Sequence, residues 1–258
     1  VLDLSISFLN FISIKIVMKS PSCKKNTVSV CMATYNGEKY IKEQLNSILP
    51  QLNEDDEVII SDDGSHDKTL EIIESFHDDR IKIYHHSAPH AVVSNFENTI
   101  KHASGDYIFL SDQDDIWLSN KKEKCLSCLQ EYDFISHNAF IVDKHGVLSG
   151  KDYFSLRRTR YGYWHNLWKM GYLGCCMAFR RECLKDILPF PKEILWHDMW
   201  IASVLHLKYK GRLLDDELIL YRRHGDNASP TTQKSQYSWR FKFQYRNYIF
   251  WHSLKRAL

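Results

Sequence analysis

Between residues 27 and 111, short apolar runs alternate with stretches that have helical spacing. Four apolar runs, rich in β-branched residues, are typical of buried strands and cover 27–34, 57–61, 80–84 and 106–111. Three intervening stretches repeat apolar residues every three or four positions, which predicts helices over 38–49, 67–76 and 94–103. This alternation predicts an α/β fold with an open, mostly parallel central sheet flanked by helices.

The second half of the chain has a less regular pattern. It predicts two helices and three strands: helices over 118–131 and 196–209, and strands over 132–142, 172–179 and 212–220. The stretch 151–168 is rich in Arg, Tyr and Trp but weakly periodic, so we expect a mobile loop over a site. In the first of these helices, Lys121, Lys122 and Lys124 are expected to face solvent.

Polar side chains collect where the predicted strands end, at 34–36, 62–63 and 112–115. Ligands of such sheets bind at the carboxyl ends of the strands, so these groups are expected to converge. Asp112 and Asp114 are one residue apart and face the same side of an extended chain, with Gln113 turned away. Oxygen ligands at this spacing suit Mg²⁺ or Mn²⁺. The alternative is a solvated acidic turn that caps the next helix.

Composition narrows the class of protein. The chain has 258 residues, enough for one large α/β domain or two small ones, and its net charge of +2 provides no global field that selects nucleic acid. The seven cysteines are scattered, which argues against a secreted disulfide framework and fits a reducing setting. Cys175 and Cys176 are interpreted as core packing. No G-x-G-x-x-G or P-loop motif occurs, so a bound diphosphate needs another source of positive charge.

The two ends of the chain are expected to lie outside the main domain. Residues 1–26 have no basic leader and no cleavage site, and their apolar part is too short to cross a membrane; they are interpreted as an N-terminal extension with little structure. Residues 230–258 interleave aromatic residues with Lys and Arg, which is typical of an interfacial helix on an anionic membrane. The alternatives are an amphipathic helix packed on the domain and a homodimer contact.

Four ordered motifs resemble those of glycosyltransferase family 2, which comprises inverting, nucleotide-sugar-dependent enzymes with the GT-A fold. They are VCMATYNG at 30–37, ISDDGSHD at 60–67, GDYI at 105–108 and SDQDDIW at 111–117. The last has the form found in rhamnosyltransferase-like members that build O-antigen or capsule. The resemblance implies one GT-A domain over 27–229, with a nucleotide-binding half at 27–117, an acceptor-binding half at 118–229, and a C-terminal helical tail.

The same resemblance implies a nucleotide site at the carboxyl edge of the sheet. The residues that it assigns to nucleotide binding are Thr34, Tyr35, Asn36, Asp62, Asp63, Asn95, Asp112 and Arg223. Tyr35 would stack on the base, and Asp62 or Asp63 would accept hydrogen bonds from the base or the ribose. The alternative for these two carboxylates is capping of the next helix.

The resemblance also implies a Mn²⁺ or Mg²⁺ ion, held by Asp112, Asp114 and His224 against the donor diphosphate, which would stabilise the leaving nucleoside diphosphate. Arg222 or Arg223 would reach the diphosphate, and a solvated basic turn is the alternative. The residues implied as contacts to the donor sugar or the acceptor are Asp115, Trp117, Trp196 and His197. Asp115 has a second interpretation as a helix cap, and His197 has one as a core or capping histidine.

An inverting transfer needs a general base that takes the proton from the acceptor hydroxyl. In the family this base is usually the Asp of a Glu-Asp pair at a helix start. Here the matching pair is His197-Asp198, which assigns Asp198 as the base. Trp196 and Trp200 flank this carboxylate and would raise its pKa by desolvation. The alternative for Asp198 is a helix N-terminal carboxylate that stabilises the helix dipole.

The sequence therefore predicts an inverting glycosyltransferase that moves a sugar from a dTDP-, UDP- or GDP-sugar to a glycan or a lipid-linked acceptor in bacterial O-antigen or capsule synthesis. Its expected location is cytoplasmic, peripheral on the inner membrane. One alternative is a sugar-nucleotide nucleotidyltransferase, which would need a Gly-rich basic loop after the first strand. The other is a non-catalytic nucleotide-sugar-binding module, against which the presence of Asp112, Asp114 and Asp198 together argues.

Overall fold

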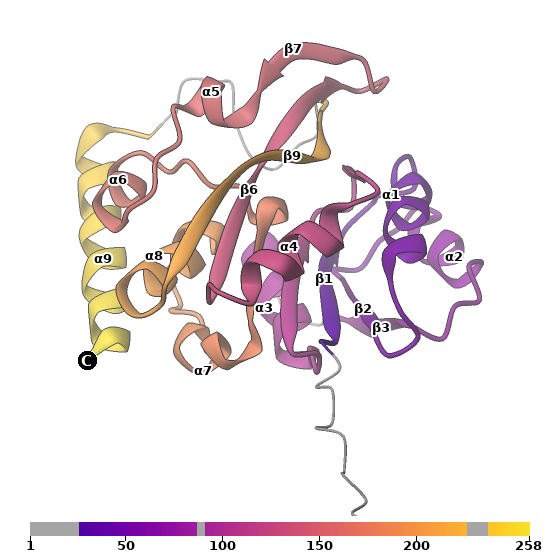
Figure 1. The fold of residues 1–258 in the computed structure, drawn as a ribbon, viewed down its shortest axis with the longest axis horizontal. Coiled ribbons are helices and arrows are strands. Elements are labelled where there is room, and N and C mark those ends of the chain that lie inside the picture. The colour runs from indigo at the N-terminus through magenta and orange to yellow at the C-terminus, as the bar shows by residue number, and fades with distance from the viewer. Residues whose placement is uncertain (1–25, 87–90, 226–236) are drawn as a thin grey trace, which may run out of the picture.

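The core of the protein is one mixed sheet flanked by helices, seen in a computed structural model that describes residues 26–86, 91–225 and 237–258 (Figure 1). The predicted extension lies outside the described residues, apart from Asn26. The first half of the sheet consists of four parallel strands: β3 (Ile81–His85), β2 (Glu57–Asp62), β1 (Val28–Thr34) and β4 (Tyr107–Ser111).

The second half of the sheet mixes the two strand directions. β8 (Met177–Arg180) runs antiparallel to both β4 and β6 (Phe134–Asp143), and β6 is parallel to β9 (Gly211–Arg223). Two short strands complete it: β5 (Ile116–Trp117) pairs with β9, and β7 (Leu148–Asp152) pairs with β6. Among the described residues the sheet has nine strands in the order β3-β2-β1-β4-β8-β6-β9-β5, with β7 beside β6.

Two groups of helices cover the two faces of the sheet. The helices on one face are α1 (Ile41–Ile48), α2 (Thr69–Glu74) and α4 (Lys121–Leu129). Those on the other are α3 (Val92–His102), α7 (Leu184–Ile187) and α8 (His197–Lys208). Within β1, Val30 and Met32 belong to the first core and Cys31 to the second. This use of both faces explains why the strand is a continuous apolar run.

The predicted α/β architecture is confirmed, but the prediction of a loop over 151–168 is wrong. The stretch 151–168, expected to be a loop, includes the end of β7 and two short helices, α5 (Tyr153–Arg157) and α6 (Tyr163–Trp168). Asp152 caps α5 by accepting a hydrogen bond from the backbone N–H of Ser155 at 2.9 Å. Helices of one to two turns are too short to produce a visible apolar period, which is why the pattern did not reveal them.

The expectation that the lysines of α4 face solvent is wrong for Lys121 and Lys122, which are buried. Lys121 donates from Nζ to the carbonyl oxygen of Cys175 at 2.8 Å. Lys122 forms a buried ion pair with Asp56. Charged side chains are rarely buried without such partners, and here the partners come from distant parts of the chain.

The C-terminal tail forms the long helix α9 (Trp239–Ala257), which packs on the domain as one alternative expected. Tyr245, Ile249 and Ser253 form its buried face, and the hydroxyl of Tyr245 accepts a hydrogen bond from the backbone N–H of Leu195 at 2.9 Å. Aromatic residues alternate with other residues at the start of this helix, and this spacing is compatible with a helix because aromatic side chains lie on both its buried and its open faces. Within the described residues, no helix has the length and apolarity that a membrane span requires.

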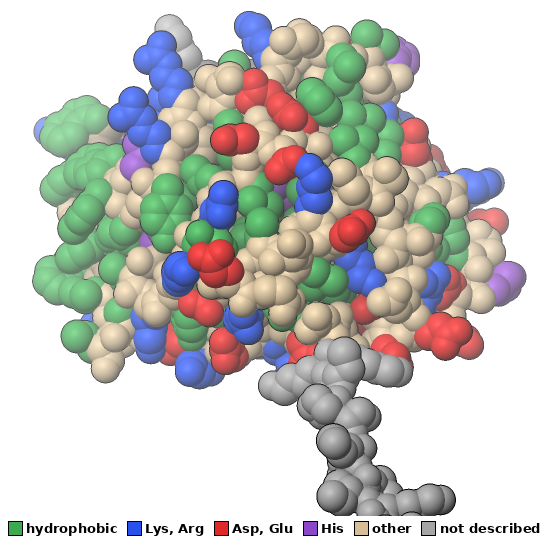
Figure 2. Space-filling model, viewed as in Figure 1, with side chains coloured by type: hydrophobic (Ala, Val, Ile, Leu, Met, Phe, Trp, Pro, Cys, Tyr) green, Lys and Arg blue, Asp and Glu red, His purple; other side chains and the backbone are tan. Residues whose placement is uncertain are grey.

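The open side of α9 and the neighbouring α6 form an aromatic surface, which we define as Trp164, Trp168, Phe243, Phe250 and Trp251. Trp164 stacks on Phe250 with ring centroids 5.6 Å apart, and Trp168 lies 6.4 Å from Phe243. Trp164 is 62% exposed and Trp251 is 57% exposed. Figure 2 shows hydrophobic side chains gathered along the edge of the molecule where α9 lies.

Candidate functional site

The loop that joins β4 to β5 carries the acidic motif at the carboxyl edge of the parallel strands. Ile116 pairs with Leu220, so the end of β9 lies beside this loop. The side chain of Gln113 accepts a hydrogen bond from the N–H of Tyr35 and donates one to its carbonyl, both at 3.0 Å. A Cβ atom at Gly37 would lie 2.4 Å from Gln113 Oε1, so a larger residue there would displace the Gln113 amide. Gln113 thereby anchors the acidic loop to the turn after β1.

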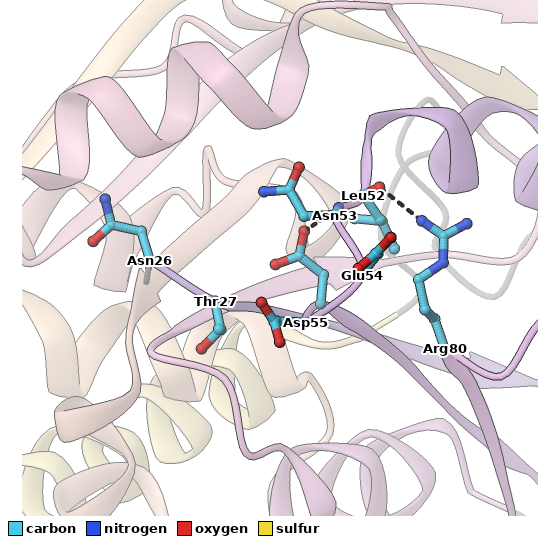
Figure 3. A pocket seen from close by; sticks show the side chains of 8 residues that line it. Asn26, Thr27, Leu52, Asn53, Glu54, Asp55 and Arg80 are labelled. Carbon is cyan, nitrogen blue, oxygen red and sulfur yellow. Dashed lines mark hydrogen bonds between the residues drawn. The ribbon is translucent and has the colours of Figure 1, made fainter. Parts of the chain in front are cut away.

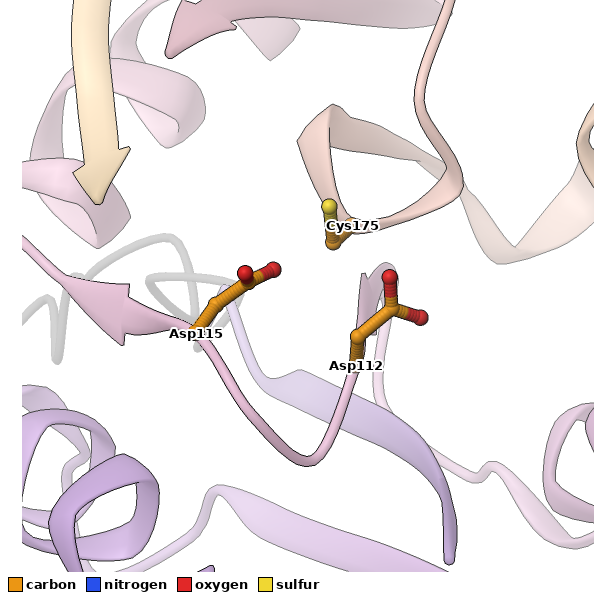
Figure 4. A group of neighbouring side chains, drawn as sticks. All are labelled: Asp112, Asp115 and Cys175. Carbon is orange, nitrogen blue, oxygen red and sulfur yellow. The ribbon is translucent and has the colours of Figure 1, made fainter. Parts of the chain in front are cut away.

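Asp112, Asp115 and Cys175 bring three ligand atoms within 4.8 Å of one another (Figure 4). Burial, followed by the charge of Asp114, raises the pKa of Asp112 to about 7, and the same two causes raise the pKa of Asp115 well above its usual value. Oδ1 of Asp115 accepts a hydrogen bond from the backbone N–H of Arg222 at 3.0 Å, whereas its buried Oδ2 has no hydrogen-bond partner. A buried carboxylate oxygen without a partner suits a bound cation.

Asp114 meets His224, the residue after β9. Oδ2 of Asp114 lies 2.7 Å from Nε2 of His224, whose ring stacks on Tyr40 with centroids 4.8 Å apart. Arg222 donates to the carbonyl oxygen of Asp114 at 2.9 Å and to the carboxylate of Glu43 at 2.6 Å. These contacts hold the end of β9 against the acidic loop and against α1.

Residues predicted to bind the nucleotide meet at the ends of β1 and β2. Thr34 donates from Oγ1 to Oδ1 of Asp62 at 2.8 Å, and Oδ2 of Asp62 accepts a hydrogen bond from the N–H of Ser65 at 2.8 Å. The Asp62 carboxylate therefore stabilises the turn before α2. Asp63 lies next to it, with Oδ1 2.9 Å from Nδ1 of His86. Any contact of either carboxylate with a nucleotide stays a prediction.

Tyr35, Asn36 and Asn95 lie around the same strand end. Tyr35 is 44% exposed, so its ring is accessible for stacking. Asn36 has a φ of 48°, a left-handed conformation that asparagine tolerates. The Asn95 amide donates to the carbonyl of Thr34 at 3.2 Å, while its buried Oδ1 has no hydrogen-bond partner. The fold brings Asn95, on α3, next to Thr34, Tyr35 and Asn36 at the end of β1, although Asn95 is far from them in the sequence.

Asp198, the predicted base, lies in the first turn of α8. After burial and the charge of Asp114, the charge of Asp198 also contributes to the raised pKa of Asp112. Burial raises the pKa of Asp198 itself to about 6, although Oδ1 accepts a hydrogen bond from the N–H of Met199 at 2.7 Å. A carboxylate with this pKa is largely ionised at neutral pH and is a stronger base than an exposed aspartate.

His197 is half-buried and precedes Asp198 in the chain. Its ring stacks on Phe96 with centroids 3.9 Å apart, and burial lowers its pKa to about 3, so the ring is neutral at pH 7. A Cβ atom at Gly174 would lie 2.5 Å from Nε2 of His197. This close fit holds the turn Gly174–Cys176 against the start of α8. The predicted contact of His197 with a sugar remains a prediction.

Three further predicted residues have distinct surroundings. The Trp196 ring meets the Tyr245 ring of α9 edge-on, with centroids 5.0 Å apart. Trp117 is only 3% exposed and packs 5.8 Å from the ring of Phe109, a core position that does not favour its predicted sugar contact. The guanidinium group of Arg223 donates to the hydroxyl of Tyr221 at 3.3 Å.

Two residues near the acidic loop were not predicted as part of the site. Cys175 was interpreted as core packing and Lys121 as an exposed lysine. The burial of Lys121 could have been predicted from the sequence. Lys121, Cys125 and Leu129 are spaced four residues apart, so they share the buried face of α4. The position of Cys175 beside the acidic loop could not have been predicted, because it depends on the pairing of β8 with β4 and β6.

A separate hollow of about 520 Å³ lies at the other end of the parallel strands (Figure 3). Asn26, Thr27 and Arg80 are among its lining residues, and Arg80 donates to the carbonyl oxygen of Leu52 at 2.7 Å. Thr27 immediately precedes β1, so this hollow is at the amino ends of the strands. Ligands of open α/β sheets bind at the opposite edge, where the acidic loop and Asp198 lie.

Comparison with known proteins shows which family the chain is related to. The model of the family "Glycosyl transferase family 2" matches residues 29–188. The chain is 30% identical over 218 residues to the dTDP-rhamnosyl transferase RfbG of Shigella flexneri, which covers 76% of this chain and 72% of that protein. It is 29% identical over 166 residues to the UDP-Glc:alpha-D-GlcNAc-diphosphoundecaprenol beta-1,3-glucosyltransferase WfgD of Escherichia coli, which covers 64% of each.

Solved structures share the fold. TarS of S. aureus in complex with UDP-GlcNAc superposes with a TM-score of 0.71 at 21% identity, covering 90% of this chain and 68% of that chain. The mannosyltransferase PcManGT of Pyrobaculum calidifontis, in complex with GDP-Man and Mn²⁺, superposes with a TM-score of 0.57 at 18% identity, covering 89% of this chain and 64% of that chain. The mixed sheet with its flanking helices is thus the GT-A fold, and the chain belongs to glycosyltransferase family 2.

Proposed function

We propose that this glycosyltransferase moves a sugar, with inversion, from a dTDP-, UDP- or GDP-sugar to a hydroxyl group of a glycan or lipid-linked acceptor in surface polysaccharide synthesis. The observation that carries the proposal is the placement of Asp198. Asp198 lies in the first turn of α8, burial raises the pKa of its carboxyl group to about 6, and its charge contributes to the raised pKa of Asp112. In this proposal, residues 27–117 bind the nucleotide, 118–229 bind the acceptor, and 230–258 form the tail.

The donor diphosphate needs positive charge, and the acidic loop fits a divalent cation. Asp112 and Asp114, with His224 beside Asp114, would hold Mn²⁺ or Mg²⁺. The unpartnered Oδ2 of Asp115 and the mutual repulsion of the buried carboxylates support this fit. When bound, such an ion supplies charge stabilisation for the departing diphosphate.

The residues of the chain account for the other parts of the reaction. Tyr35 would stack on the base, and Arg223 would approach the diphosphate from the end of β9. Asp198 would accept the proton of the acceptor hydroxyl as its oxygen attacks the anomeric carbon from the face opposite the leaving group. The aromatic ring of Trp196, at the start of the same helix, would position a sugar.

A donor screen tests this proposal against the two alternatives. Purified protein would be incubated with UDP-, dTDP- and GDP-sugars and Mn²⁺ or Mg²⁺, and both nucleoside diphosphate release and sugar transfer would be measured. Release of nucleoside diphosphate from one donor class supports the glycosyltransferase. Formation of a nucleotide sugar from a sugar phosphate and a nucleoside triphosphate would support the nucleotidyltransferase. Tight nucleotide binding without turnover would support the binding module.

The aromatic surface favours an acceptor at a membrane, and we extend the proposal to peripheral contact with an anionic bilayer. Residues 239–258 contain five Lys or Arg and no Asp or Glu, and residues 153–169 contain four and none. The guanidinium group of Arg246 lies 5.4 Å from the Trp168 ring, so charge and aromatic area occur together. Such a combination binds the interface of anionic lipids. α9 also contacts Trp196, next to Asp198, so a lipid-linked acceptor would meet the base close to the bilayer.

Replacing Trp164 and Trp251 together with serine is expected to weaken binding to phosphatidylglycerol-containing vesicles by roughly tenfold or more, because burying one aromatic side chain contributes about 1.5–3 kcal/mol. Cosedimentation with vesicles measures the effect. Val147→Ser with Leu148→Ser is the matched control, since these exposed apolar residues belong to the β6–β7 hairpin. Equal binding of both double variants would contradict the proposal. So would a concentration-dependent dimer of the wild type that does not bind vesicles, because a second copy would then cover the surface.

A further inference from the structure

The thiol of Cys175 lies against the carboxylates of the acidic loop although the chain separates them widely. Its sulfur and one oxygen each from Asp112 and Asp115 lie within 4.8 Å of one another. Figure 4 shows Asp112 and Asp115 on the loop after β4, and Cys175 across from them on the turn before β8. All three therefore face a point that one small ion could occupy.

The backbone around Cys175 is held in place from two sides. Nζ of the buried Lys121 donates to the Cys175 carbonyl at 2.8 Å, and Gly174 fits closely against Nε2 of His197. The backbone of Cys175 is therefore held by α4 and packs beside the start of α8.

A second observation points to a ligand in this space. Asp115 is 1% exposed, and its Oδ2 has no hydrogen-bond partner. Asp112 is half-buried and Cys175 is buried, so solvent gives this oxygen little access to a partner, and buried polar atoms in native proteins are normally partnered. A divalent cation would partner this oxygen and the two neighbouring ligands at the same time.

We propose that Cys175 supplies a sulfur ligand to the divalent cation, together with Asp112 and Asp115, and that this set replaces Asp114 and His224, which lie outside the group and contact each other at 2.7 Å. The proposal rests on the metal-assisted function argued above and deepens it by naming a soft ligand. On binding, the sulfur loses its proton to solvent and coordinates as a thiolate. Sulfur ligands favour softer ions, so this site would bind Cd²⁺ or Zn²⁺ strongly. Its preference for Mn²⁺ over Mg²⁺ would also be greater than that of a site with oxygen ligands only.

Titration of the wild type with Cd²⁺ in thiol-free buffer tests the sulfur contact directly, because a cadmium–thiolate bond produces a charge-transfer absorption in the ultraviolet. We expect one such site in the wild type, its loss in Cys175→Ser, and its weakening in Asp112→Asn. Cys183→Ser is the matched control, since Cys183 is also fully buried but belongs to the opposite core. An unchanged cadmium absorption in Cys175→Ser would overturn the proposal.

Calorimetric affinities for Cd²⁺ and Mg²⁺ give a second readout that is independent of catalysis. Changes in outer partners of metal ligands already alter affinity by about 10–100-fold, so Cys175→Ser is expected to lower the Cd²⁺-to-Mg²⁺ affinity ratio by at least about tenfold. If the serine variant melts at a lower temperature than Cys183→Ser, Cys175→Ala replaces it. Metal-dependent transfer with an unchanged affinity ratio overturns the sulfur ligand and leaves the proposed function standing. Absence of any divalent-ion binding by the wild type overturns both.

Discussion

Asp198→Asn is expected to lower kcat for sugar transfer by roughly 10²–10⁴-fold, the usual contribution of a general base. Asparagine keeps the size of the side chain and can retain the hydrogen bond with the N–H of Met199, but it cannot accept the acceptor proton. Donor binding should stay unchanged, because in our proposal this residue contacts the acceptor. Steady-state kinetics and calorimetry with nucleoside diphosphate would separate the two effects.

Asp216→Asn is the control for this variant, because Asp216 is an exposed aspartate on β9 that pairs with Lys124 at the surface. It should keep wild-type kinetics. Full activity of Asp198→Asn would show that another group takes the proton.

The pH dependence of the wild type gives a check on the same residue. The base must be ionised to act, and burial raises the pKa of Asp198 to about 6. The rate is therefore expected to be constant above about pH 7 and to fall tenfold per pH unit well below the pKa. In Asp198→Asn the residual rate should lose this acidic limb. An acidic limb that persists in the variant would assign the titration to a different group.

Removal of divalent metal is expected to lower the transfer rate by roughly 10²-fold or more, since such an ion supplies several kcal/mol of charge stabilisation to the transition state. A chelator would abolish activity and added Mn²⁺ or Mg²⁺ would restore it. Asp112→Asn should imitate metal removal and raise the metal concentration needed for half-maximal activity. Asp143→Asn is the matched control, because Asp143 is an exposed aspartate at the last position of β6.

A wild-type rate that survives exhaustive chelation, together with unchanged kinetics of Asp112→Asn, would contradict the metal proposal. The acidic loop would then have to function with its carboxylates protonated or paired within the protein, as Asp114 already is with His224.

The nucleotide half could be predicted from the sequence because its strands follow one another and pair locally. Once 27–34 and 106–111 are buried parallel strands, the residues after them must meet at one edge. Asp112 could therefore be placed beside Thr34 from pattern alone. The helical period likewise placed Asp198 in the first turn of a helix, although its distance from Asp112 required the structure.

The rest of the site depends on contacts between distant segments, which no local period encodes. Asp62 was identified correctly as a polar strand end, but only the fold shows that its carboxylate is engaged by Thr34 and Ser65. Cys175 enters the site because β8 inserts between β4 and β6. An apolar residue that the sequence assigns to the core, such as Cys175, can therefore line the site when its strand begins next to the acidic loop.

The parallel pairing of β6 with β9 also has a consequence for the order in which the protein assembles. β1 to β4 can pair as they leave the ribosome, but β6 must wait for α5 to α8 to be synthesised before β9 is available. Loop closure over such a separation is slow. The acidic loop would then acquire its Arg222 and His224 contacts only in the last stage of synthesis. Limited proteolysis of ribosome-bound chains that stop before Gly211 should find residues 28–111 protected and Asp115 accessible; equal protection of both would contradict this order.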